Sequence, residues 1–189
     1  IGKGENQTNM QVQLAALSNP EKQTKFENCV ADVNIPLGEV FTSPKLAGTN
    51  GILNVGTVYI GDIQYRNLRM EFKDGRVVSA VCDNFVENGV IDQEAGHRLI
   101  VQGIMNGHEM LPLGEFAIGT NTTAYAMAEK FGILDRLPIL IVEKMGPHFA
   151  VGDTCYSWSE DSPMYNPDGK EMIARDNEVS ILRKEDVSK

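Results

Sequence analysis

Three short segments of the sequence carry carboxylate and imidazole side chains that could do chemistry together. The phrase Pro-Leu-Gly-Glu occurs twice, over residues 36–39 and 112–115, and each glutamate follows a glycine and precedes an apolar pair. A third segment supplies Glu143 and His148. A glutamate among apolar neighbours is costly to bury unless a cation or a hydrogen-bond donor meets it. The three segments therefore favour one site centred on a metal.

The donor types indicate which metals and which reaction such a site would support. Carboxylate and imidazole ligands suit zinc, cobalt, manganese or magnesium, whereas copper(I) and iron–sulfur clusters prefer thiolates. Several carboxylates around one point also permit two ions that share a bridging glutamate and activate a water. A further carboxylate near that water would act as general base. A phenol such as Tyr156 could donate a hydrogen bond to a developing oxyanion.

Each of these residues also has an ordinary structural explanation. Glu39 and Glu115 could be turn or helix-capping acids, because most acidic side chains lie at the surface. Glu143 could mark the exposed end of a strand, with Lys144 as a surface charge beside it. His148 could be a hydrogen-bonded core histidine, which is the commoner role of a lone histidine. The residues alone leave both interpretations open.

Composition excludes several classes of partner. The 189 residues, 42% hydrophobic and 23% charged, are typical of one globular domain. A net charge of −9 argues against nucleic acid as the main partner, because phosphate binding needs a basic face. The longest apolar stretch, residues 137–142, is far too short to span a membrane. Three cysteines without a Cys-x-x-Cys pair favour a reducing, cytoplasmic compartment, with Cys29 and Cys82 as small buried hydrophobes.

Strands dominate the predicted secondary structure. Residues 68–81 predict a hairpin, because apolar and polar residues alternate before the turn pair Asp74-Gly75 and a β-branched run follows it. Residues 42–51, which contain a proline and two glycines, predict a loop. Further strands are predicted over residues 10–17, 52–60, 137–142 and 178–183, and residues 36–41 form a short apolar piece between turn residues.

Two helices are predicted among these strands. Asp92 can cap a helix that runs to about Met105, and Asn121 can cap a second helix that ends at Phe131. His97 in the first helix and the nearby loop residue His108 are expected to face solvent. The whole pattern predicts an α+β fold with a mainly antiparallel, barrel-like sheet and two main helices.

Three stretches, the third in two parts, occur in the order of the thermophilic metallo-aminopeptidases and resemble this family of aminopeptidase T, aminopeptidase S and PepS. The motifs cover residues 38–44, 113–121, 143–144 and 148–152, and the predicted hairpin lies where that family also has one. The resemblance extends from about residue 2 to residue 156. It implies that Glu39, Glu115 and His148 are metal ligands and that Glu143 is the general base or a further ligand.

The sequence departs from the family pattern in two places. Cys155 occupies the position of the family's active-site tyrosine, so that Tyr156, one residue later, is the candidate for its role. The family completes its two-metal site with a His-x-Asp pair farther along the chain, and no histidine follows His148 here. We therefore expect residues 1–189 to be a single domain, the C-terminal catalytic and metal-binding domain of a larger peptidase, truncated at both ends.

The resemblance implies an aminopeptidase that removes N-terminal residues from peptides through a water activated by two divalent ions, zinc, cobalt or magnesium. It also implies a homodimer with a peptide as substrate. The fragment alone is expected to bind ions weakly and to lack turnover. Two alternatives stay open. One is a non-catalytic relative that acts as an interaction or dimerisation module, and the other is a thiol-dependent enzyme that uses Cys155 with His148.

Overall fold

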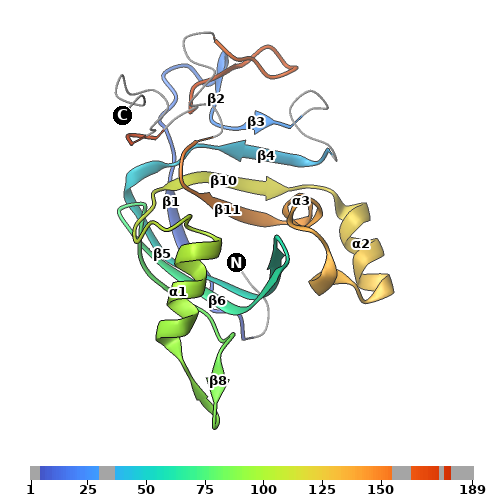
Figure 1. Ribbon diagram of the computed structural model, residues 1–189. Helices are drawn as coiled ribbons and strands as arrows, with labels where there is room; N and C mark the ends of the chain where they lie inside the picture. The colour runs from blue at the N-terminus through green and yellow to red at the C-terminus, as the bar shows by residue number, and fades with distance from the viewer. Residues whose placement is uncertain (1–4, 30–36, 155–162, 175–176, 180–189) are drawn as a thin grey trace.

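Two four-stranded antiparallel sheets form the body of the protein (Figure 1). The computed structural model describes residues 5–29, 37–154, 163–174 and 177–179. The first sheet has the order β1-β5-β6-β7 and consists of β1 (Asn9–Gln13), β5 (Lys45–Ile60), β6 (Ile63–Lys73) and β7 (Arg76–Val81). The second has the order β11-β10-β4-β3 and consists of β11 (Pro147–Val151), β10 (Leu113–Gly119), β4 (Glu39–Thr42) and β3 (Glu27–Asn28).

Shorter elements complete the described fold. β2 (Gln23–Thr24) pairs in parallel with β12 (Glu171–Met172), and β8 (Val86–Glu87) with β9 (Val90–Ile91) forms a small hairpin that projects from the body (Figure 1). The described helices are α1 (Gln93–Gly103), α2 (Thr122–Phe131) and α3 (Ile139–Val142), with the 3-10 turns η1 (Leu134–Arg136) and η2 (Glu143–Met145). α2 and α3 lie beside the second sheet, next to the ends of β10 and β11 (Figure 1).

The predicted hairpin is confirmed as β6 and β7. Asp74 and Gly75 have φ angles of 44° and 68°, the left-handed values that a tight turn between two strands requires. Glycine is also needed for space, because a Cβ on Gly75 would lie 2.7 Å from the Cα of Leu46. The alternation in β6 buries Met70 and Phe72 on the inner face of the sheet.

Both predicted helix starts are confirmed. The Asp92 side chain accepts a hydrogen bond of 2.9 Å from the Ala95 amide at the start of α1. The Asn121 side chain accepts one of 2.9 Å from the Ala124 amide at the start of α2, and Gly132 ends that helix in a left-handed conformation.

The predicted loop over residues 42–51 is wrong. β5 begins at Lys45 and continues without a break to Ile60. Gly51 lies inside this strand, where a Cβ would stand 2.1 Å from the carbonyl oxygen of Asn9 on β1. The glycine therefore permits a close approach of two strands, which sequence alone does not distinguish from a turn.

One predicted strand is wrong, and another is only partly described. Residues 137–142 form a turn of helix rather than a strand, because α3 begins directly after Pro138, a residue well suited to a helix start. An apolar run this short fits either structure. Residues 178 and 179 lie in a turn, and residues 180–183 of that predicted strand lie outside the described residues.

The fold class is confirmed in its coarse form. Helices and mostly antiparallel sheets are mixed, and the described strands do not close into a barrel, so that part of the prediction stays unconfirmed. The larger apolar core lies on the first sheet, and its buried members include Tyr65, Leu68, Met70, Phe72, Val77, Ile100 and Leu113. A smaller one lies on the second sheet and consists of Cys29, Phe41, Ala117, Met172 and Ala174. In the part of the chain that is described, no helix has the length and apolar character needed to cross a bilayer.

Candidate active site

The second sheet places three of the predicted metal ligands on one face. Glu39 on β4 is opposite Gly119 on β10, and His148 on β11 is opposite Ala117 on β10. Side chains alternate along a strand, and directly opposed residues project from the same face. Positions 115, 117 and 119 share that face, so Glu39, Glu115 and His148 all project from it.

A glycine brings the fourth predicted residue to this face. A Cβ on Gly119 would lie 2.3 Å from the carbonyl carbon of Lys144 and 2.4 Å from the carbonyl oxygen of Glu143. Only glycine therefore lets the η2 backbone lie directly against β10. Two hydrogen bonds fix this approach, from the Gly119 amide to the Gly146 carbonyl at 2.8 Å and from the Asn121 amide to the Lys144 carbonyl at 2.9 Å.

Lys144 lies at the centre of the resulting cluster. Its side chain is 0% exposed, and its Nζ donates to Glu39 Oε1 at 2.5 Å and to Glu143 Oε1 at 2.9 Å. The alternative interpretation, in which Lys144 is a surface charge at the exposed end of a strand, is therefore wrong. The cause is the helical course of α3 and η2, which turns Lys144 inward and leaves Glu143 half-buried beside it.

His148 contacts the same carboxylate from the other side. Its Nε2 lies 3.2 Å from Glu39 Oε2, and its Nδ1 lies 3.1 Å from the Gly146 carbonyl oxygen. Burial lowers the pKa of His148, but the bonds to Glu39 and Gly146 and the nearby charge of Glu115 outweigh burial and raise the pKa. Glu115 therefore lies within electrostatic reach of the cluster.

The electrostatics keep Glu39 ionised. Burial alone would raise the pKa of this carboxyl, but the hydrogen bonds from His148 and Lys144 lower it to about 2. Burial and the charge of Glu39 raise the pKa of the neighbouring Cys29 thiol to about 11. The Cys29 thiol is thus neutral at physiological pH, as expected for a buried structural cysteine.

Glu39 and His148 have the chemistry of a metal-binding pair. A ligating histidine commonly donates its second ring nitrogen to a backbone carbonyl, as His148 Nδ1 does to Gly146. The 3.2 Å between His148 Nε2 and Glu39 Oε2 also suits two ligands of one ion with bonds of about 2.0–2.2 Å. The donor pair therefore fits a divalent ion. Among the described residues, however, no group of three or more His, Cys, Asp and Glu side chains is arranged to hold one.

The cluster unites most of the sequence-predicted site, but not all of it. Lys144 contacts both Glu39 and Glu143, and His148 contacts Glu39. Glu115 projects from the same face of the sheet. Tyr156 and its neighbour Cys155 lie outside the described residues. The sequence analysis missed the burial of Lys144. Pro138, a helix-start signal, could have predicted α3, but it does not predict which way the Lys144 side chain points.

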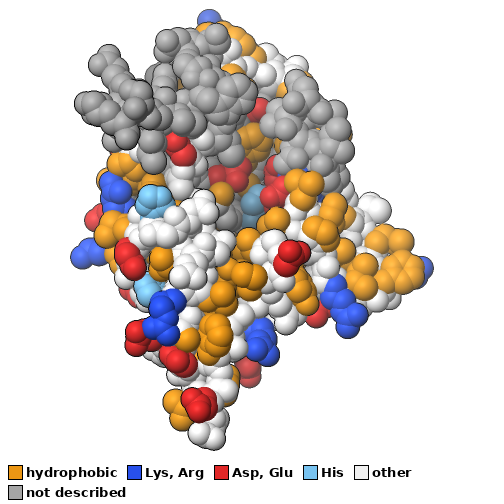
Figure 2. Space-filling model, viewed as in Figure 1, with side chains coloured by type: hydrophobic (Ala, Val, Ile, Leu, Met, Phe, Trp, Pro, Cys, Tyr) orange, Lys and Arg blue, Asp and Glu red, His pale blue; other side chains and the backbone are white. Residues whose placement is uncertain are grey.

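Acidic side chains and a histidine gather in a hollow on one face of the molecule (Figure 2). Apolar side chains border one side of this hollow. A site lined in this way could accept a small, partly apolar molecule with a positively charged end.

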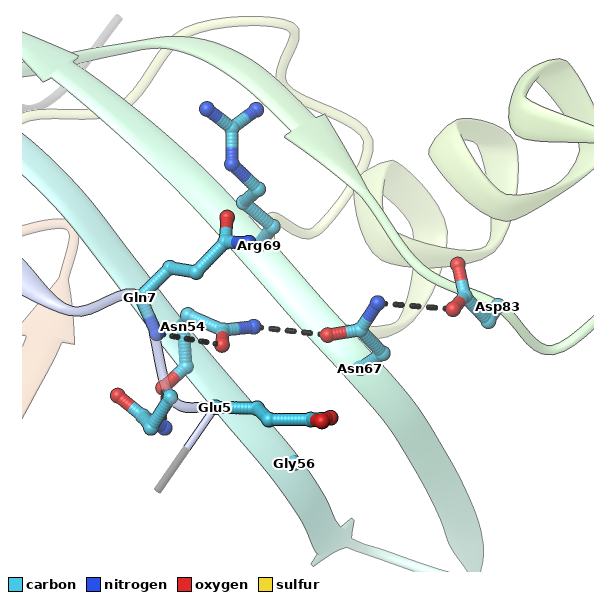
Figure 3. A pocket seen from close by; sticks show the side chains of 8 residues that line it. Glu5, Gln7, Asn54, Gly56, Asn67, Arg69 and Asp83 are labelled. Atoms are coloured by element: carbon cyan, nitrogen blue, oxygen red, sulfur yellow. Dashed lines mark hydrogen bonds between the residues drawn. The ribbon is translucent and has the colours of Figure 1, made fainter. Parts of the chain in front are cut away.

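A second hollow is separate from this cluster (Figure 3). It has a volume of about 820 Å³ and lies on β5 and β6 of the first sheet. A chain of hydrogen bonds runs through it, from the Gln7 amide to Asn54 at 3.1 Å, from Asn54 to Asn67 at 2.9 Å, and from Asn67 to Asp83 at 2.8 Å. These bonds attach the segment before β1 to the sheet. None of the described residues that line it is a predicted catalytic residue.

Comparison with known proteins identifies the family. No curated protein matches the sequence. Among solved structures, wild-type AmpT from Thermus thermophilus is similar at 18% identity and a TM-score of 0.45, and the alignment covers 79% of this chain and 32% of that one. The chain thus spans under a third of that protein's length. The sequence profile of the thermophilic metalloproteases (M29) matches residues 3–162, which include the whole cluster around Lys144. This match covers most of the chain, and the chain therefore belongs to the thermophilic metalloprotease family M29.

Proposed function

We propose that the protein is a metal-dependent aminopeptidase that removes N-terminal residues from peptides. One observation carries the proposal: the charged group Glu39, Glu143, Lys144 and His148, in which Glu39 and Lys144 are buried, lies inside the segment that matches the metalloprotease family. Buried charges are costly and are retained in proteins mainly where they are paired or functional. The narrowing from metallopeptidase to aminopeptidase rests on the resemblance of the motifs to aminopeptidases T and S.

Glu39 and His148 would hold the ion, with Glu115 as a further ligand on the same face. When bound, a divalent ion supplies a water that is ionised near neutral pH and a positive charge for the developing oxyanion. The number of ions that the resemblance implies, two, stays a prediction, as does their identity as zinc, cobalt or magnesium.

Glu143 is the residue we assign to proton transfer. Lys144 Nζ donates a hydrogen bond of 2.9 Å to Glu143 Oε1, and this bond keeps the Glu143 carboxylate oriented beside Glu39. Glu143 would take the proton of the attacking water and pass it to the amine that leaves when the peptide bond breaks. Tyr156 stays the predicted donor to the oxyanion. The acidic surroundings would attract the free amino group of the substrate, which accounts for action at the N-terminus.

The remaining expectations are proposals of the same kind. The 189-residue chain alone would bind ions weakly and would not turn over substrate, and the complete protein would be a cytoplasmic homodimer. The alternative, a non-catalytic interaction or dimerisation module, gains support from the described residues, because their acidic and imidazole groups do not form a three-ligand centre. A measurement of activity separates the two.

The test uses the complete protein with its natural ends. A dipeptide amide with a free amino group should be hydrolysed, its N-acetylated form should not, and a chelator should abolish the reaction until zinc or cobalt is returned. Glu143→Gln should lower kcat by about 100-fold or more, because general acid–base catalysis contributes that much. His108→Gln, a change of an exposed loop histidine, should have no effect. A folded and metal-loaded protein without hydrolysis would favour the non-catalytic module, and chelator-resistant hydrolysis would contradict the proposed dependence on a metal.

A further inference from the structure

We propose that the ammonium group of Lys144 takes the place of one of the two divalent cations, so that the site holds a single ion. This inference rests on the proposed function and concerns only the composition of its site. Lys144 belongs to the motif over residues 143–144, but neither the family match nor the motif resemblance gives it a role.

The two oxygens of Glu39 face two different cationic partners. Oε1 accepts a hydrogen bond from Lys144 Nζ at 2.5 Å, and Oε2 faces His148 Nε2 at 3.2 Å. In two-metal sites a carboxylate commonly bridges the ions and gives one oxygen to each. Glu39 has this bridging arrangement, but a lysine stands at one of the two positions. Oε2, on the side of His148, is left as the oxygen for an ion.

The second carboxylate supports the same assignment. Glu143 Oε1 lies 2.9 Å from Lys144 Nζ, so that one ammonium group joins two carboxylates of the site. The ammonium group thus lies between two carboxylates, in the role that a bridging metal ion would otherwise have. The ammonium neutralises part of their charge and would repel a divalent ion brought close to it.

Lys144 is also fixed in place. Its side chain is fully buried, and its carbonyl oxygen accepts a hydrogen bond of 2.9 Å from the Asn121 amide. Its backbone lies against Gly119, where not even a Cβ would fit. The long side chain therefore cannot move aside into solvent without a shift of η2. An ordinary surface pair in this protein is different: Arg98 and Glu94 are in contact at 2.6 Å but are 57% and 83% exposed.

The test counts ions per chain in the complete protein. The protein is stripped with a chelator and then titrated with zinc at free concentrations set by a competing chelator, and bound zinc is measured by elemental analysis. We expect one ion in the wild type. Lys144→Met, which keeps the length and removes the charge, should bind a second ion at least about tenfold more tightly than the wild type does, because the repulsion is gone.

Two variants serve as controls. Lys144→Arg keeps the positive charge and should still bind one ion. Lys130→Met changes an exposed lysine of α2 and should match the wild type. Zinc should also raise the thermal midpoint of Lys144→Met more than that of the wild type, because the ion then replaces the missing cation between Glu39 and Glu143.

The outcomes separate this inference from the proposed function. Two tightly bound ions in an active, chelator-sensitive wild type would overturn the inference and leave the proposed function intact. A single ion in folded Lys144→Met would do the same. If that variant does not fold, the wild-type count decides: one ion supports the inference and two overturn it. A wild type without bound zinc and without chelator-sensitive hydrolysis would overturn both.

Discussion

The two sheets use burial in opposite ways. The first sheet, of β1, β5, β6 and β7, packs side chains such as Tyr65, Met70 and Phe72 into a large apolar core. The second sheet has a small core around Phe41 and Ala117, and beside it Glu39 and Lys144 are buried as charges. Apolar burial stabilises a fold, whereas a buried ion pair at best offsets the cost of its own desolvation. The first sheet therefore supports the structure, and the second holds the residues to which we assign the proposed chemistry.

The largest expected loss of stability comes from the first sheet. Phe72→Ala removes a ring that is 2% exposed and should lower the free energy of unfolding by about 3–5 kcal/mol. Val78→Ala on β7, where the side chain is 49% exposed, should change it by less than about 0.5 kcal/mol. Urea unfolding followed by circular dichroism measures both. Equal effects of the two variants would contradict the division of roles between the sheets.

The second sheet should respond to a change of charge at constant shape. Glu39→Gln keeps the size of the side chain but leaves Lys144 with Glu143 as its acidic partner among the described residues. We expect a loss of about 3 kcal/mol, the low end for a broken buried pair, because Glu143 still compensates part of the charge.

The matched control is the exposed pair on α1. Glu94→Gln removes the contact with Arg98, and it should cost less than about 0.5 kcal/mol, because water screens both groups. A loss as small in Glu39→Gln as in Glu94→Gln would show that the cluster around Lys144 is not buried in solution.

The sequence predicted those parts of the fold that local signals determine. The turn pair Asp74-Gly75 and the caps Asp92 and Asn121 act within a few residues, and all three features are present. The loop predicted over residues 42–51 failed, because Gly51 serves a contact with a strand some forty positions earlier in the chain. Nothing near Gly51 in sequence distinguishes that use from a turn.

The candidate site shows the same limit. Glu39, Glu115 and His148 were predicted from their motifs, and strand pairing brings them to one face. Lys144 could not be placed, because its burial depends on Gly119 and on the course of η2 across β10. A local motif can identify a candidate ligand, whereas the charged groups that surround this ligand in the fold come from segments far away in the sequence.

The smallest change in stability is expected at His97 on α1, which contacts β7 of the first sheet. The His97 side chain is half-buried rather than solvent-facing as predicted, and it lies 2.9 Å from the Ala80 carbonyl oxygen and 3.1 Å from Glu109. Both partners are hydrogen-bond acceptors, so that they favour the protonated ring, which can donate from both nitrogens. The bond to Ala80, then the bond to Glu109, raise the pKa of His97 above its ordinary value.

A raised pKa in the folded state stabilises the protein below the pKa of the unfolded chain, and this contribution disappears as the pH rises through the folded value. The wild type should therefore lose up to about 1 kcal/mol of this contribution above neutral pH, and no more, because Glu109 is exposed and screened. His97→Gln should remove this part of the pH dependence, and His108→Gln should keep it. Urea unfolding from pH 5.5 to 8.5 measures the three profiles. A His97→Gln profile parallel to that of the wild type would mean that the imidazole does not contribute a charge to stability. The comparison between the exposed contact of His97 with Glu109 and the buried contact of Lys144 with Glu39 would then fail.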